Sequence, residues 1–276
     1  MTGFVEVATD VLVLRYPVLD VNSTLIVGSE IAAVVDTLST GDQATELLAE
    51  VRRVTPLPLV IINTHHHYDH CFGNDTLAGA VPGTTIWAHE EAARILREEG
   101  TTWQRDWAEE WQAREPEFAD ALSAVALRPP DRTLREESIM DIGGRCIELR
   151  HFGRGHTEGD LVAILSDVDV VLAGDLVEHG APPGFGDSYP IEWPETVAAL
   201  LHRTTPASIV IPGHGAPVDT AFVTAQHAEL SALAWLIRDG HADGADPEAV
   251  AAKAPFGTAA ALQAVHRGYA ELAGKI

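Results

Sequence analysis

Four residues of one short segment are of types that can serve as metal ligands: His65, His67, Asp69 and His70. The segment directly follows the apolar run 58–63, which predicts a buried strand that ends where these residues begin. Imidazole nitrogens and carboxylate oxygens are the donors that zinc and related ions take in proteins. Packing alone does not call for so many of them in one loop, so the segment predicts a metal site.

Three later residues repeat this arrangement, each following or closing an apolar run and each lying beside a glycine: His156, Asp175 and His214. Glycine permits the tight backbone that turns a neighbouring side chain toward a shared point. Together with the first segment they supply five imidazoles and two carboxylates. That number is enough for two metal ions that share one carboxylate.

The order of these motifs, HxHxDH at 65–70, GHT at 155–157, GD at 174–175 and PGHG at 212–215, resembles the metallo-β-lactamase superfamily. The resemblance implies an αββα sandwich with a two-metal site at one edge. It implies that the first ion is held by His65, His67 and His156. It implies that the second is held by Asp69, His70 and His214, with Asp175 as the bridging carboxylate.

The resemblance also separates this chain from two other branches of the superfamily. Flavodiiron members place a glutamate where this chain has His67, and several β-lactamase subclasses place a cysteine where it has Asp175. The family has a structural carboxylate at the position of Asp36, and we expect Asp36 to orient the metal loop without touching metal. His66 matches no ligand position, so we expect it to face solvent or to support the ligands.

The remaining histidines on apolar flanks carry no metal-binding pattern. For any one of them, the expected role is that of an ordinary hydrogen-bonded polar group. These residues are His89, His151, His179 and His202.

The ligand set indicates a hydrolase with two Zn²⁺ ions, and iron or manganese are compatible with the same donors. Two ions lower the pKa of a bridging water, and the hydroxide attacks a carbonyl of an ester, lactone, thioester or β-lactam. Asp69 is the expected catalytic proton acceptor. The alternative is a mononuclear iron oxygenase of the persulfide-dioxygenase type, which would not need the full second set. A third possibility is a binding protein without activity, against which the complete ligand set argues.

Composition narrows the class of substrate. The chain has 18 basic and 41 acidic residues, a net charge of −23, which disfavours nucleic acids as partners. The cations of the C-terminal tail are scattered, so an anionic glutathione thioester ranks below an uncharged or apolar small molecule; these cations are Arg238, Lys253, Arg267 and Lys275. The oligomeric state stays open.

The length of 276 residues and an apolar content of 46% suit a single domain over residues 1–276. Two cysteines, Cys71 and Cys146, lie far apart in the sequence and predict no disulfide framework. We expect Cys71 to pack in the interior. The sequence shows neither a basic leader nor an apolar run of membrane-spanning length, so we expect a cytoplasmic protein that does not bind membranes.

Hydrophobic periodicity places the elements around these motifs. We expect a helix over 44–54 capped by Thr40, helix 194–203, a helical insertion over about 89–127 and C-terminal helices over about 217–272. The expected strands are 11–14, 23–27, 31–35, 58–63, 145–149, 161–165, 170–172 and 208–211.

Two segments are candidates for shaping the substrate pocket. Trp103, Trp107 and Trp111 lie on one face of the helical insertion, where packing is the favoured interpretation and an aromatic lid the alternative. The glycine- and proline-rich segment 178–190, which contains Phe185, Asp187 and Tyr189, is either a specificity loop or an ordered connection.

Overall fold

The computed structural model of the chain describes residues 3–276. The chain divides into two compact units, residues 1–150 and 151–276. The organisation of the whole chain as a single domain stays a prediction.

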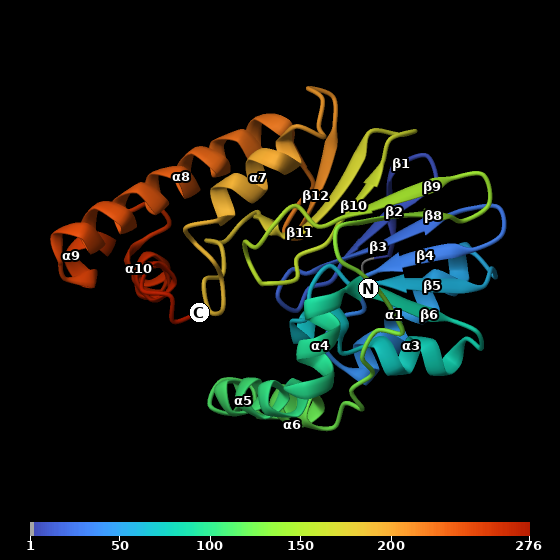
Figure 1. The fold of residues 1–276 in the computed structure, drawn as a ribbon. Helices are drawn as coiled ribbons and strands as arrows, with labels where there is room; N and C mark the ends of the chain where they lie inside the picture. The colour runs from blue at the N-terminus through green and yellow to red at the C-terminus, as the bar shows by residue number, and fades with distance from the viewer. Residues whose placement is uncertain (1–2) are drawn as a thin grey trace. The chain divides into compact units, whose positions relative to one another are not determined.

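The first unit is built on a seven-stranded mixed sheet in which the strands follow their order in the sequence (Figure 1). The first four strands are antiparallel, and β4 to β7 are parallel. The strands are β1 (Val5–Ala8), β2 (Val11–Arg15), β3 (Asn22–Val27), β4 (Ala32–Val35), β5 (Leu59–Ile62), β6 (Thr85–His89) and β7 (Arg132–Leu134). The residues of β4 and β5 are all buried, as expected for apolar strands in the parallel part of a sheet.

Helices α1 (Gly41–Val54), α2 (Tyr68–Cys71) and α3 (Asn74–Ala80) follow β4 and β5. The predicted cap is confirmed, because the Thr40 hydroxyl accepts a hydrogen bond from the Gln43 backbone N–H at 3.3 Å. Leu47 of α1 and Leu77 of α3 pack with strand residues in one apolar core. This core fixes the end of β5, from which the metal loop departs.

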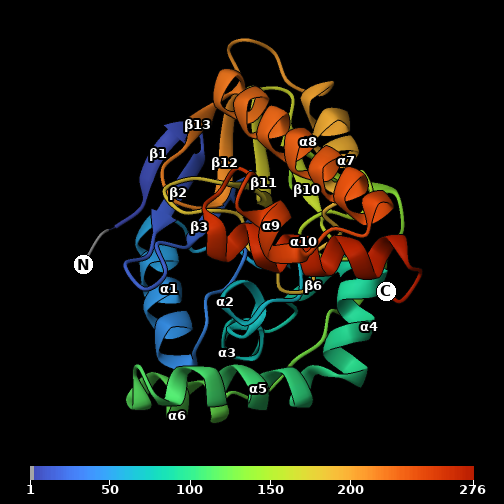
Figure 2. The same ribbon diagram turned by 90° about the vertical axis from the view of Figure 1, so that its left-hand side faces the viewer.

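The predicted helical insertion is confirmed and consists of three helices between β6 and β7: α4 (Glu90–Glu98), α5 (Gly100–Gln112) and α6 (Pro116–Ser123). Helices α5 and α6 lie side by side (Figures 1 and 2). The strands β8 (Glu137–Asp141) and β9 (Cys146–Arg150) form an antiparallel hairpin at the end of this unit.

The second unit contains four strands in the order β13-β12-β11-β10. They are β10 (Val162–Leu165), β11 (Val170–Glu178), β12 (Ile209–His214) and β13 (Val218–Asp219). Strand β11 is longer than expected, since the prediction ended it at residue 172. Asp175 therefore lies inside a buried strand.

The helices of this unit are α7 (Trp193–Leu201), α8 (Thr220–Asp243), α9 (Pro247–Ala251) and α10 (Thr258–Leu272), which confirms the helical tail (Figure 2). Trp193, Leu230, Ile237 and Val265 bring α7, α8 and α10 into one core with the strands. Within residues 3–276, no helix combines the length and the apolar character needed to cross a membrane.

Candidate metal centre

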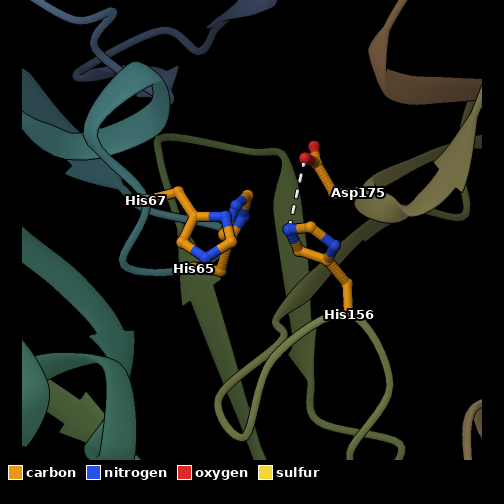
Figure 3. A group of neighbouring side chains, drawn as sticks. All are labelled: His65, His67, His156 and Asp175. Carbon is orange, nitrogen blue, oxygen red and sulfur yellow. Dashed lines mark ion pairs between the residues drawn. The ribbon is translucent and has the colours of Figure 1, made fainter. Parts of the chain in front are cut away.

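The segment 64–70 follows β5 and runs into α2, and its histidine rings lie against one another. The rings of His65 and His67 lie side by side (Figure 3), and their centroids are 4.6 Å apart. The ring centroids of His65 and His70 are 4.2 Å apart. His65, Asp69 and His70 are buried, and His67 is partly exposed. The fold thus gathers the four predicted donors of the first unit.

Asp36 orients this segment, as predicted. Its carboxylate accepts hydrogen bonds from the Thr64 backbone N–H at 2.8 Å and the Thr64 hydroxyl at 2.7 Å. It also pairs with Nδ1 of His70 at 2.8 Å, and the Thr64 hydroxyl lies 3.0 Å from Nδ1 of His65. Asp36 therefore fixes one ligand directly and a second through Thr64, leaving Nε2 of each ring as the nitrogen for metal.

Burial raises the pKa of Asp36, while His70 and the hydrogen bonds from Thr64 oppose that rise. The backbone of Asp36 lies in the left-handed region, with φ of 64°. Such a conformation in a residue other than glycine persists only where the surroundings enforce it, as the bonds to Thr64 and His70 do here.

A second set of buried polar groups holds the backbone of the segment. The His70 carbonyl accepts hydrogen bonds from the Thr37 backbone N–H at 2.8 Å and from the Asn63 side-chain amide at 3.2 Å. The amide of Asn74 is paired with that of Asn63 at 2.8 Å. These bonds fix the start of α2 and so the directions of Asp69 and His70.

Two of the expectations for this segment have different outcomes. His66 is only 1% exposed, so of the two roles expected for it the solvent-facing one is excluded, and support of the ligands stays a prediction. Cys71 is buried, as predicted, and its thiol donates to the His66 carbonyl at 3.1 Å. Burial raises the pKa of Cys71 well above its usual value, which keeps the thiol protonated. Both cysteines are free in the structure.

The tryptophans of α5 pack beside the metal segment and remain half-buried. The Trp107 ring lies 5.6 Å from that of His67 and 5.1 Å from that of Tyr68, and the Trp103 ring lies 5.9 Å from that of His66. Trp111 donates to the Tyr68 hydroxyl at 3.0 Å. The packing interpretation is supported for Trp107 and Trp111, which join an apolar cluster, and Trp103 lies at its margin.

In the second unit, Asp175 lies between two histidines. Its Oδ2 is 3.4 Å from Nε2 of His156 and 3.4 Å from Nε2 of His214, and Figure 3 marks the first of these pairs. Donors about 2.1 Å from one tetrahedral ion lie about 3.4 Å apart. The donor set and its spacing therefore suit the binding of a divalent metal ion.

Main-chain groups and glycines fix these three ligands. Nδ1 of His156 pairs with the Gly184 carbonyl at 3.1 Å, which directs Nε2 toward Asp175. Gly213, the residue before His214, comes so close to Asp175 that a Cβ atom there would lie 1.7 Å from Oδ1. Glycine was predicted to be needed beside the ligands, and at Gly213 the reason is that any side chain would collide with the Asp175 carboxylate.

The segment 178–190 is an ordered connection for most of its length. Phe185 is fully buried against Trp193, and Tyr189 is buried beneath the Arg154 guanidinium, 4.1 Å from the ring centroid. The burial of both side chains favours the ordered connection over the specificity loop at these two positions. Asp187 remains partly exposed.

Sequence reasoning missed Glu178. This residue ends β11 and is buried, and one of its oxygens lies within 4.8 Å of donor atoms of both Asp175 and His214. The one sequence feature that could have pointed to Glu178 as a candidate ligand is its position three residues after Asp175. Alternation in a regular strand would have put the two side chains on opposite faces, and only the irregular pairing between Gly174 and Glu178 brings them together.

Three of the other histidines have the ordinary roles expected of them. Nδ1 of His89 accepts from the Glu91 backbone N–H at the start of α4. Nδ1 of His151 pairs with the Asp160 carbonyl, and Nδ1 of His179 accepts from the Ala216 backbone N–H. His202 is exposed.

The chain belongs to the metallo-β-lactamase superfamily, a class of metal-dependent hydrolases, because residues 16–214 match the model of that family. This confirms the resemblance read from the motifs. It also confirms the fold class, two mixed sheets flanked by helices.

Known relatives agree with this assignment. A metallo-β-lactamase of Pontibacter korlensis is 20% identical, with a TM-score of 0.66 over 84% of this chain and 99% of that one. A type 2 metallo-β-lactamase of Bacillus sp. (strain 170) is 30% identical over 35% of this chain and 39% of its own. An acyl-coenzyme A thioesterase of Gallus gallus is 28% identical over 50% of this chain and 49% of its own. The chain therefore spans half or less of the curated relatives that it matches.

Proposed function

We propose that this protein is a dinuclear metal-dependent hydrolase that cleaves a carbonyl compound such as an ester, lactone, thioester or β-lactam. The observation that carries the proposal is the position of Asp175, whose Oδ2 lies 3.4 Å from Nε2 of both His156 and His214. A carboxylate oxygen between two imidazoles suits a bridge between two cations and serves no purpose in apolar packing.

The ligands that we assign are those that the resemblance to the superfamily implies. The first ion takes His65, His67 and His156, and the second takes Asp69, His70 and His214, with Asp175 shared. Membership of the superfamily and the hydrogen bonds of Asp36 to His70 and Thr64 support this assignment. Zinc is the metal that we expect, with iron or manganese as alternatives.

The two ions, when bound, supply hydroxide at neutral pH and polarise the substrate carbonyl. The residues of the chain hold and direct the reacting groups. Asp69, buried and 3.7 Å from Nε2 of His70, is the carboxylate that we assign to accept the proton and pass it to the leaving group. Asp36 keeps the rings of His65 and His70 in one orientation throughout.

We infer that the substrate is uncharged or apolar. A net charge of −23 repels anions such as nucleic acids and acyl-coenzyme A, and the half-buried Trp103 offers an apolar surface beside the metal segment. The names of the relatives point to a β-lactam and to a thioester, and both belong in the substrates to be tested.

Elemental analysis of the purified protein, followed by assays with a lactone, a thioester and a chromogenic cephalosporin, tests the proposal. We expect two zinc ions per chain and turnover of at least one substrate. D69N should reduce turnover by at least about a hundredfold, whereas D75N, which alters an exposed carboxylate in α3, should change nothing. One iron per chain would favour the oxygenase alternative, and no metal would contradict the proposal.

A further inference from the structure

Glu178 is a buried carboxylate beside Asp175 and His214 to which the proposed function gives no role. It ends β11, and His214 ends the adjacent strand β12, where the two residues are partners in the parallel ladder. Their side chains and that of Asp175 place one donor atom each within 4.8 Å of one another. All three therefore face one small volume.

The backbone beneath Glu178 is firmly held. The amide oxygen of Gln226, a buried residue of α8, accepts the Glu178 backbone N–H at 3.0 Å. The amide nitrogen of Gln226 donates to the Leu176 carbonyl at 2.9 Å. On the other strand, the His214 carbonyl accepts the His179 backbone N–H at 3.3 Å. The backbone at the ends of both strands is thus fixed by hydrogen bonds.

The spacing of these donors is compatible with a shared ion. Two donors about 2.1 Å from one ion lie at most about 4.2 Å apart, and the three donor atoms here all lie within 4.8 Å of one another. Glu178 is only 8% exposed and lies close to a second carboxylate, that of Asp175. A divalent ion held by His214 and Asp175 would lower the electrostatic cost of burying the two negative charges together.

We propose that Glu178 is an additional carboxylate ligand of the metal bound by His214 and Asp175, and that it raises the affinity of this position for Mn²⁺ more than for Zn²⁺. The proposal rests on the proposed function only in that Asp175 and His214 bind a metal. Carboxylate oxygens suit manganese, whereas a site rich in imidazole suits zinc. Each added carboxylate oxygen therefore reduces the amount by which the affinity for Zn²⁺ exceeds the affinity for Mn²⁺.

The test measures metal binding and does not depend on turnover. Protein stripped by a chelator is titrated with Mn²⁺, followed by electron paramagnetic resonance, and with Zn²⁺ in competition with a chromophoric chelator. The variants are E178Q, which keeps the shape but removes the charge, and E178D, which keeps the charge at shorter reach. E229Q, in an exposed position of α8, is the matched control.

We expect E178Q to weaken Mn²⁺ binding at one of two sites by at least about tenfold and Zn²⁺ binding by clearly less. E178D should lie between wild type and E178Q, and E229Q should equal wild type. Far-UV circular dichroism of each apo variant shows that it is folded, and should E178Q fail to fold, the Mn²⁺ affinity of E178D decides the matter.

Equal losses for both metals, or unchanged affinities in folded E178Q and E178D, would overturn the assignment of Glu178. If wild type binds two ions and E178Q binds them equally well, only this inference is lost. If wild type binds fewer than two ions, the proposed dinuclear function is contradicted as well.

Discussion

The two ligand-bearing regions of the molecule are held by different kinds of group. In the first unit, a buried carboxylate and a set of side-chain amides and hydroxyls orient the histidines, with Asp36 at the centre. In the second unit, a backbone carbonyl orients His156, and a glycine lets two strands bring His214 beside Asp175. The first region depends on the chemistry of its side chains, and the second on the path of its backbone.

This difference predicts which substitutions each region tolerates. Side-chain networks in a low-dielectric interior fail when one member loses its hydrogen-bonding pattern. A closely approached backbone fails when a Cβ atom is added, whatever its polarity. Both kinds of support are complete without metal, since each is made of protein atoms alone.

Metal removal has the largest expected effect on activity and the smallest on the fold. Because both regions are held by the protein, chelation should abolish turnover and leave the far-UV circular dichroism of the apo protein nearly unchanged. Added zinc should restore activity. Unfolding on mild chelation would show that the metals are structural and that neither region holds its ligands unaided.

G213A tests the backbone-held region. The added Cβ would lie 1.7 Å from Oδ1 of Asp175, so the strands must separate or the carboxylate must leave its place. We expect at least one metal ion to be lost and the free energy of unfolding to fall by about 3 kcal/mol, measured by elemental analysis and urea denaturation. G186A is the control, because a Cβ there meets only the Gln263 amide, at an ordinary 3.7 Å.

D36N tests the region held by side chains. The amide that replaces the carboxylate presents an N–H group to donors, so the bonds to Thr64 and His70 cannot all form. Metal affinity should fall by about 10- to 100-fold, and the free energy of unfolding by about 1–3 kcal/mol. The matched D75N protein should behave as wild type. If D36N binds metal normally, the side-chain network has no role in holding the ligands.

W107A separates packing from substrate contact next to the first region. Trp107 is half-buried among Tyr68, Phe72 and Trp103, so its loss should lower stability by about 1–3 kcal/mol, less than for a fully buried tryptophan. W235A, at a tryptophan 62% exposed on α8, is the control for the residue type. A W107A protein with an unchanged melting temperature and a raised KM would make α5 a substrate-binding element instead.

R267A should have the smallest effect. The guanidinium of Arg267 on α10 donates to the carbonyls of Asp187 and Ser188 at 2.8 and 3.0 Å and so fixes the segment whose Gly184 carbonyl orients His156. We expect a loss of about 1 kcal/mol in stability and a few-fold loss in metal affinity. In R267K, the ammonium group lacks the fixed pair of N–H donors with which the guanidinium bonds both carbonyls. The stability and the metal affinity of R267K should therefore lie between those of wild type and R267A. Wild-type metal affinity in R267A would show that the segment stays in place without α10.

The sequence was most informative where the required residue types are rare. The clustered histidines of 65–70, the glycine-flanked His156, Asp175 and His214, and the apolar strand runs all predicted their surroundings, because few other arrangements use them. Predictions were weakest where one pattern serves two purposes. A stripe of tryptophans on one helix face has the same sequence pattern whether it packs in a core or forms a lid. An aromatic residue in a glycine-rich segment likewise has the same pattern whether it is exposed or, like Phe185, fully buried.

The sequence by itself determined the superfamily, the chemistry of the donors and the order of the elements, because residue type and local periodicity are properties of the chain. Tertiary structure alone decided which groups hold those donors. Asp36 and His70 are 34 residues apart in the sequence, and Gly184 and His156 are 28 apart. Helix and strand periodicity predicts contacts only between residues close in the sequence, so it could not predict these two pairs. Tertiary structure also decided that Glu178 faces Asp175, since an irregularity in strand pairing reverses the face that alternation would predict.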